Sequence, residues 1–171
     1  MSAPLAIRTA LPFALVLGLS GCGPQQKTSA ILTAHPSVHA HTHETQHGGV
    51  AVELGEEEYH VEFTFGETPG TLEAYFLDGE MEDYVRLAIP SFTATANVGG
   101  RDFPLQFEAT TNSATGEKSG DSALFEARAE WLIARPDLKL TVPALAIKGH
   151  DYTNLSVALP ARSPPKPVPT S

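Results

Sequence analysis

Six of the chain's seven histidines lie within a short stretch of the sequence: His35, His39, His41, His43, His47 and His60. In an extended backbone the imidazoles of His39, His41 and His43 point the same way, about 7 Å apart. A flexible chain can close that gap and place two imidazoles on one Zn²⁺, Cu²⁺ or Ni²⁺ ion. With His47 as a further donor, the spacing predicts capture of a divalent transition metal, at modest affinity because binding must order the chain. The alternative, which the sequence leaves open, is a polar linker that contains histidines by chance.

His60 belongs to a predicted β-hairpin. Apolar residues alternate over 50–54 and 59–65, and a loop at 55–58 pairs Leu54 with Tyr59, Val52 with Val61 and Val50 with Phe63. This register sets His60 opposite Glu53 and beside Glu62. Such a group can hold a metal, but the arrangement favours a solvated sheet face on which the imidazole pairs weakly with Glu. Extended further, the register places His47 opposite Gly66, about 20 Å from His60. A joint site of His47 and His60 therefore needs a different register.

Cys22 is the only cysteine and stands at the end of a secretory signal. Residues 1–21 contain one charged residue, Arg8, followed by an apolar run that is too short for a transmembrane helix. The sequence Leu19-Ser20-Gly21-Cys22 resembles a bacterial lipobox, which implies acylation of Cys22 and anchoring in a membrane. Gly23 stands where many inner-membrane lipoproteins have Asp, so the resemblance favours the outer membrane, facing the periplasm. A single cysteine also excludes disulfide scaffolds.

The composition restricts the possible partners. Of the 171 residues, 42% are hydrophobic, and 11 Lys and Arg stand against 20 Asp and Glu, a net charge of −9. Removing residues 1–21 deletes only Arg8 among the charged residues, so the mature chain has 10 basic and 20 acidic residues and a net charge of −10. Nucleic-acid binding is excluded because it needs a basic patch. Acyl chains on Cys22 must supply the membrane anchoring.

The chain divides into a signal peptide (1–21), a flexible tether that contains the histidines (22–46), one folded domain (47–160) and a Pro-rich tail (161–171). In the domain, Gly99-Gly100 predicts a hairpin that pairs Val98 with Arg101 and Phe92 with Phe107. Between these pairs, Ala96 faces Phe103 and Ala94 faces Leu105, while Pro104 indicates an edge strand or a bulge. Further strands are predicted at 71–77, 84–89, 123–131, 138–147 and 152–159, with a helical turn at 131–134 as an alternative.

This pattern predicts an all-β fold, an antiparallel immunoglobulin-like sandwich of about 7–9 strands. No catalytic motif is present in the domain, which predicts that the protein is not an enzyme. The acidic turn Asp78–Asp83 does not have the spacing of an EF-hand loop.

Residues 47–90 resemble a group of small bacterial envelope proteins. The matching motifs are His47-Gly48-Gly49-Val50, His60-Val61-Glu62 and Tyr75-Phe76-Leu77-Asp78-Gly79. Members begin a β domain with His-Gly-Gly, often behind a His-rich leader, and some adaptor proteins of heavy-metal efflux systems start similarly. Relatives carry a His in the Asp-Gly turn, where this chain has Glu80. The resemblance implies metal handling in the envelope and no particular reaction.

Two functions therefore remain after the sequence is considered. The first is a lipid-anchored periplasmic binding or accessory protein that captures Zn²⁺, Cu²⁺ or Ni²⁺ through His39, His41, His43, His47 and His60. The second is a structural or protein-interaction lipoprotein of the envelope with no metal role, which docks a partner through a sheet edge or its acidic face.

Overall fold

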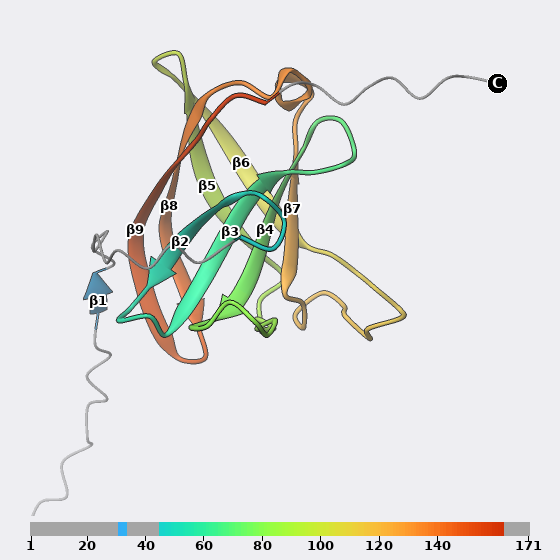
Figure 1. Cartoon of the computed structure of the whole chain (residues 1–171), viewed down its shortest axis with the longest axis vertical. Coiled ribbons are helices and arrows are strands. Elements are labelled where there is room, and N and C mark those ends of the chain that lie inside the picture. The colour runs from blue at the N-terminus through green and yellow to red at the C-terminus, as the bar shows by residue number, and fades with distance from the viewer. Residues whose placement is uncertain (1–30, 34–44, 163–171) are drawn as a thin grey trace, which may run out of the picture.

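The computed structural model describes residues 31–33 and 45–162. The elements in chain order are β1 (Ile31–Thr33), β2 (Val50–Leu54), β3 (Tyr59–Phe65), β4 (Thr71–Asp78), β5 (Ser91–Val98), β6 (Arg101–Ala109), β7 (Leu124–Arg128), the 3₁₀ turn η1 (Glu130–Ala134), β8 (Leu138–Ile147) and β9 (His150–Leu159). They form one sheet in the order β1-β9-β8-β5-β6-β7-β4-β3-β2. The sheet curls until β2 and β9 approach each other (Figure 1). The predicted all-β antiparallel fold is confirmed.

Both predicted hairpin registers are confirmed. Strands β2 and β3 pair Val52 with Val61, and β5 pairs with β6 as expected, including Phe92 with Phe107. Gly99 and Gly100 have φ of 56° and 82°, the left-handed conformation that a two-residue turn requires. Pro104 does not lie on an edge strand, because β6 stands between β5 and β7. In the described part of the chain β6 pairs with β7 only at Glu108 and Ala109, so the backbone at Pro104 pairs with Thr95 of β5 alone.

Two predicted strands are shorter or missing. Residues 84–89 form isolated bridges, Leu77 with Tyr84 and Leu87 with Ser122, in place of a strand. The alternation there arises because Val85 and Leu87 are buried. The predicted strand at 123–131 ends at Arg128, and the helical turn follows as η1, which buries Leu132.

Three residues of the segment that we interpret as a tether join the sheet. Strand β1 pairs in parallel with β9, with Ile31 opposite Asp151 and Thr33 opposite Thr153. Figure 1 shows β1 alongside β9 at the outer edge of the sheet.

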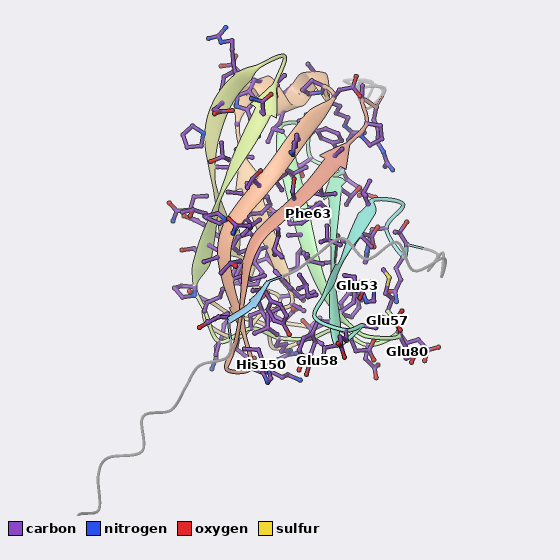
Figure 2. The ribbon with its side chains drawn as sticks, turned by 90° about the vertical axis from the view of Figure 1, so that its left-hand side faces the viewer. Glu53, Glu57, Glu58, Phe63, Glu80 and His150 are labelled. Carbon is purple, nitrogen blue, oxygen red and sulfur yellow. The ribbon has the colours of Figure 1, made fainter. Side chains whose placement is uncertain are left out.

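The core lies inside the curled sheet, and among the described residues it contains six phenylalanines. Phe92 and Phe107 stack with ring centroids 4.8 Å apart, and Phe76 contacts Phe125 edge to face at 5.5 Å. Phe63, which Figure 2 labels, packs edge to face on Phe107 at 5.9 Å. From β4 to β9 most inward-facing residues are buried and most outward-facing residues are more exposed, as period-2 alternation requires.

Strand β3 departs from this alternation because both of its faces are buried. His60, Glu62 and Thr64 point away from the core, yet each exposes less than a tenth of its surface. The segment 45–49, which we call the strap, lies over part of this outer face and contacts Glu62. The prediction that His60 and Glu62 lie on a solvated sheet face is therefore wrong.

Candidate functional site: the strap and the His47 cluster

Glu62 is the centre of the contacts beneath the strap. Its side chain is 0% exposed. Its Oε1 accepts the backbone N–H groups of His47 at 3.0 Å and of Gly49 at 2.6 Å, and its Oε2 lies 3.0 Å from Nδ1 of His47. A buried carboxylate is stable only when such donors satisfy it. Glu62 therefore joins the strap to the outer face of β3.

The two glycines after His47 allow the strap to approach the sheet. Gly48 has φ of 65°, a left-handed conformation that turns the chain. A Cβ on Gly49 would lie 2.3 Å from the carbonyl oxygen of Phe63 and 2.9 Å from Oε1 of Glu62. Since no side chain fits at these distances, this fold requires glycine at position 49, and the positive φ at position 48 favours glycine there as well.

The imidazole of His47 is fixed on three sides. Its Nδ1 faces Glu62, its Nε2 lies 3.0 Å from the hydroxyl oxygen of Tyr84, and its ring stacks on Tyr75 with centroids 3.5 Å apart and planes at 3°. A carboxylate only accepts hydrogen bonds, so Nδ1 carries a hydrogen and, in the neutral ring, Nε2 has the free lone pair. The lone pair points toward Tyr84, which is 54% exposed.

The pKa values of both neighbouring phenols and of Glu73 are raised above their ordinary values. Burial raises the pKa of Tyr75, and so does its hydrogen bond to Glu73, whose carboxylate accepts the Tyr75 O–H at 2.9 Å. Burial raises the pKa of Tyr84, with a further contribution from the charge of Glu62. Burial also raises the pKa of Glu73, and the Tyr75 hydrogen bond partly offsets it. The surroundings of His47 are thus two protonated phenols and two acidic side chains.

The structure places His47 differently from the extrapolated register. His47 contacts Glu62 and not Gly66, because β2 begins at Val50 and the strap turns at Gly48. The predicted hairpin register is nevertheless right, since His60 does pair with Glu53.

His60 is buried at 4% exposure, with Nδ1 at 3.2 Å from the carbonyl oxygen of Asp78. In the described residues, no three His, Cys, Asp or Glu side chains form a group that can hold a metal ion, so His47 and His60 are not joined in such a group. His39, His41, His43 and Cys22 lie outside the described residues.

A second polar group lies at one end of the molecule. Figure 2 shows Glu53, Glu57, Glu58 and Glu80 at the same end as His150. Glu58 accepts the O–H of the buried Tyr152 at 2.9 Å, and its carboxylate lies 4.0 Å from Nδ1 of His150. These contacts tie the β2–β3 turn to the β8–β9 turn.

Sequence reasoning missed three residues of the His47 cluster: Glu62 as its buried carboxylate, and Tyr75 and Tyr84 as its ring contacts. The signal available was the position of Glu62 and Tyr75 on outward-facing sites of neighbouring strands, directly opposite each other. That pairing shows that Glu62 and Tyr75 are neighbours on one face of the sheet. It does not predict that the strap folds over them, because the path of the strap leaves no periodic pattern in the sequence.

The described residues contain no helix with the length and apolar character needed to cross a membrane. Comparison of the chain with protein-family models, with curated proteins and with solved structures returned no match.

Proposed function

We propose that this protein is a lipid-anchored envelope protein, exposed to the periplasm, that captures a divalent transition metal and has no catalytic role. The metal is Zn²⁺, Cu²⁺ or Ni²⁺, and its ligands are the histidines at 39, 41, 43 and 47. His60 is left out of this ligand set because it is buried and bonded to the backbone of β4.

The observation that carries the proposal is the orientation of His47 by Glu62. Histidines that bind metals commonly donate the other ring N–H to a carboxylate, which fixes the tautomer and makes the free nitrogen more basic. His47 has this arrangement, with Nδ1 at 3.0 Å from the buried Glu62 and with 21% of its side chain exposed. A flexible ligand loses conformational entropy when it binds a metal, which weakens binding. His47 is already held in position in the folded chain, so this loss is smaller for His47.

The position of His47 in the chain also supports the proposal. It stands four residues after His43, at the point where the described domain begins. The alternating histidines His39, His41 and His43 therefore lie four to eight residues before His47. This length of chain is short enough for one ion to contact His47 and one of the alternating histidines together.

Calorimetric titration with Zn²⁺ and Cu²⁺ tests the metal proposal. We expect binding by the chain from residue 23 to residue 171, which keeps every described residue. The variant with His39, His41 and His43 replaced by Ala and the variant His47→Gln should each bind at least about tenfold more weakly, while His150→Gln serves as the control and binds normally. Binding weaker than about millimolar, or binding that none of these changes affects, contradicts the proposal.

The anchor is tested separately. Growth of expressing cells with a fatty-acid analogue should label the full-length chain, and Cys22→Ser should abolish the label. Label that persists in Cys22→Ser contradicts the proposed acylation without affecting the metal proposal.

A further inference from the structure

We propose that Tyr84 is a metal ligand together with His47, and that this pair selects Cu²⁺. The inference rests on the proposed function, because it assigns a further donor and a preferred ion to the same site. It uses only side chains in the described part of the chain.

The distance between the two donor atoms fits a shared ion. Nε2 of His47 and the hydroxyl oxygen of Tyr84 are 3.0 Å apart. Two bonds of about 2.0–2.1 Å that meet near a right angle separate their donor atoms by about 3 Å. A metal ion can thus replace the hydrogen that the two atoms now share, after a small rotation of the exposed Tyr84 ring. The phenol proton passes to solvent as the ion binds.

Both donors are positioned by residues that belong to the fold. The His47 ring lies between Glu62 and the stacked ring of Tyr75. Tyr84 forms a bridge with Leu77 of β4, and the next residue, Val85, is buried and donates its N–H to the carbonyl of Phe76 at 2.9 Å. The backbone that carries Tyr84 is therefore attached to the same strand as Tyr75, on which the His47 ring stacks, and this places the Tyr84 hydroxyl beside Nε2 of His47.

The charge of the cluster matches a divalent cation. Glu62 and the phenolate of Tyr84 together bring two negative charges near Nε2 of His47. Because Glu62 stays hydrogen-bonded to the strap, it acts as a positioning residue and does not itself contact the ion.

The ligand types favour copper. An imidazole nitrogen with a phenolate oxygen in a cis arrangement suits the tetragonal geometry of Cu²⁺, which also binds N and O donors more tightly than the other divalent first-row ions. Zn²⁺ prefers a tetrahedral set and gains less from a ligand that must first lose its proton. We therefore expect Cu²⁺ to displace Zn²⁺ from this site.

Visible absorption and resonance Raman spectra of the Cu²⁺-loaded chain, residues 23–171, test this inference. A phenolate bound to Cu²⁺ produces a charge-transfer band in the visible region, and excitation in that band enhances phenolate vibrations. Cu²⁺ added to the wild-type chain should produce both signals, and Tyr84→Phe should remove both and weaken Cu²⁺ binding about tenfold or more. The matched variant Tyr59→Phe, at a tyrosine elsewhere in the sheet, should keep both.

The outcomes separate the two proposals. Cu²⁺ binding without a phenolate signal, or a signal that persists in Tyr84→Phe, overturns the role of Tyr84 and leaves metal capture by the histidines in place. No binding of Cu²⁺ or Zn²⁺ by the wild-type chain overturns both. Because the absence of a phenolate signal from the wild-type chain already overturns the role of Tyr84, the proposal can be contradicted even where Tyr84→Phe does not fold.

Discussion

The backbone N–H of Gly49 donates to Oε1 of Glu62 at 2.6 Å, and this contact fastens the strap to the sheet. His47 precedes Gly49 by two residues and adds its own backbone and ring hydrogen bonds to the same carboxylate. The polar group that fixes the strap is therefore also the group that orients the exposed histidine. Stability and ligand orientation depend on one side chain.

Replacement of Glu62 by Gln tests this dependence. A glutamine amide keeps one acceptor oxygen but turns its NH₂ toward N–H donors, which leaves buried groups without partners. We expect a loss of about 2–3 kcal/mol in the free energy of unfolding, measured by urea denaturation. The control Glu126→Gln removes a carboxylate that pairs at 2.7 Å with a mostly exposed Arg128, and should cost less than about 1 kcal/mol. Equal effects of the two changes would contradict the central position of Glu62.

Gly49 should tolerate no side chain. A Cβ at this position meets the Phe63 carbonyl oxygen at 2.3 Å, so the strap must move off β3 in Gly49→Ala. We expect this change to cost about 2–4 kcal/mol, because backbone atoms must shift and the hydrogen bonds to Glu62 lengthen. Gly116, which has φ of 75° and open space around it, supplies the control. Gly116→Ala should cost only the local strain, about 1 kcal/mol, and a Gly49→Ala chain of wild-type stability would show that the strap is not held closely.

The loop at 110–122 should lose stability in acid through Glu117. Burial opposes ionisation of Glu117 and is the largest single influence, but hydrogen bonds from Thr115, from the Ala123 amide and from Ser122, with the charge of Arg86, together lower its pKa. A lowered pKa in the folded state means that the stabilisation is complete above the ordinary value of 4.5 and is lost as pH falls through the folded value.

Urea unfolding midpoints, measured from neutral pH to below the ordinary glutamate pKa, show whether Glu117 stabilises the chain more at neutral or at acid pH. The difference in urea midpoint between the wild-type chain and Glu117→Gln should be largest near neutral pH. It should shrink as pH falls below the ordinary glutamate pKa. Glu80→Gln, in an exposed turn, should show little difference at any pH. A difference for Glu117→Gln that grows on acidification would contradict the assignment.

Much of the sheet was predictable because its signals are local. The pairing of Phe92 with Phe107 follows from the two-glycine turn at Gly99 and Gly100, and the pairing of Val52 with Val61 follows from alternation on both strands. The strand predicted at 84–89 was wrong because burial of Val85 and Leu87 produces the same alternation in a segment that only bridges its neighbours.

The His47 cluster was predictable only in part. The sequence identified His47 as a candidate ligand and His-Gly-Gly as a motif, but Glu62 and His60 were placed on a solvated face. Their burial depends on what covers the outer face of β3, and the strap contact to Glu62 follows from a left-handed Gly48 and from the space that Gly49 leaves for the Phe63 carbonyl. Neither effect repeats along the sequence at the spacing of a strand or a helix, so neither can be predicted from hydrophobic alternation. Tyr84 was missed because the segment that carries it was interpreted as a strand.

The most direct measurement of the proposed metal capture is the NMR signal of the imidazole nitrogens in the ¹⁵N-labelled chain, residues 23–171, during addition of Zn²⁺. We predict that the Nε2 resonance of His47 shifts at substoichiometric Zn²⁺, while the Nδ1–H that faces Glu62 stays protonated and His150 stays unchanged. A His47 ring that does not respond, or a response confined to His150 at the other polar group, would contradict the account.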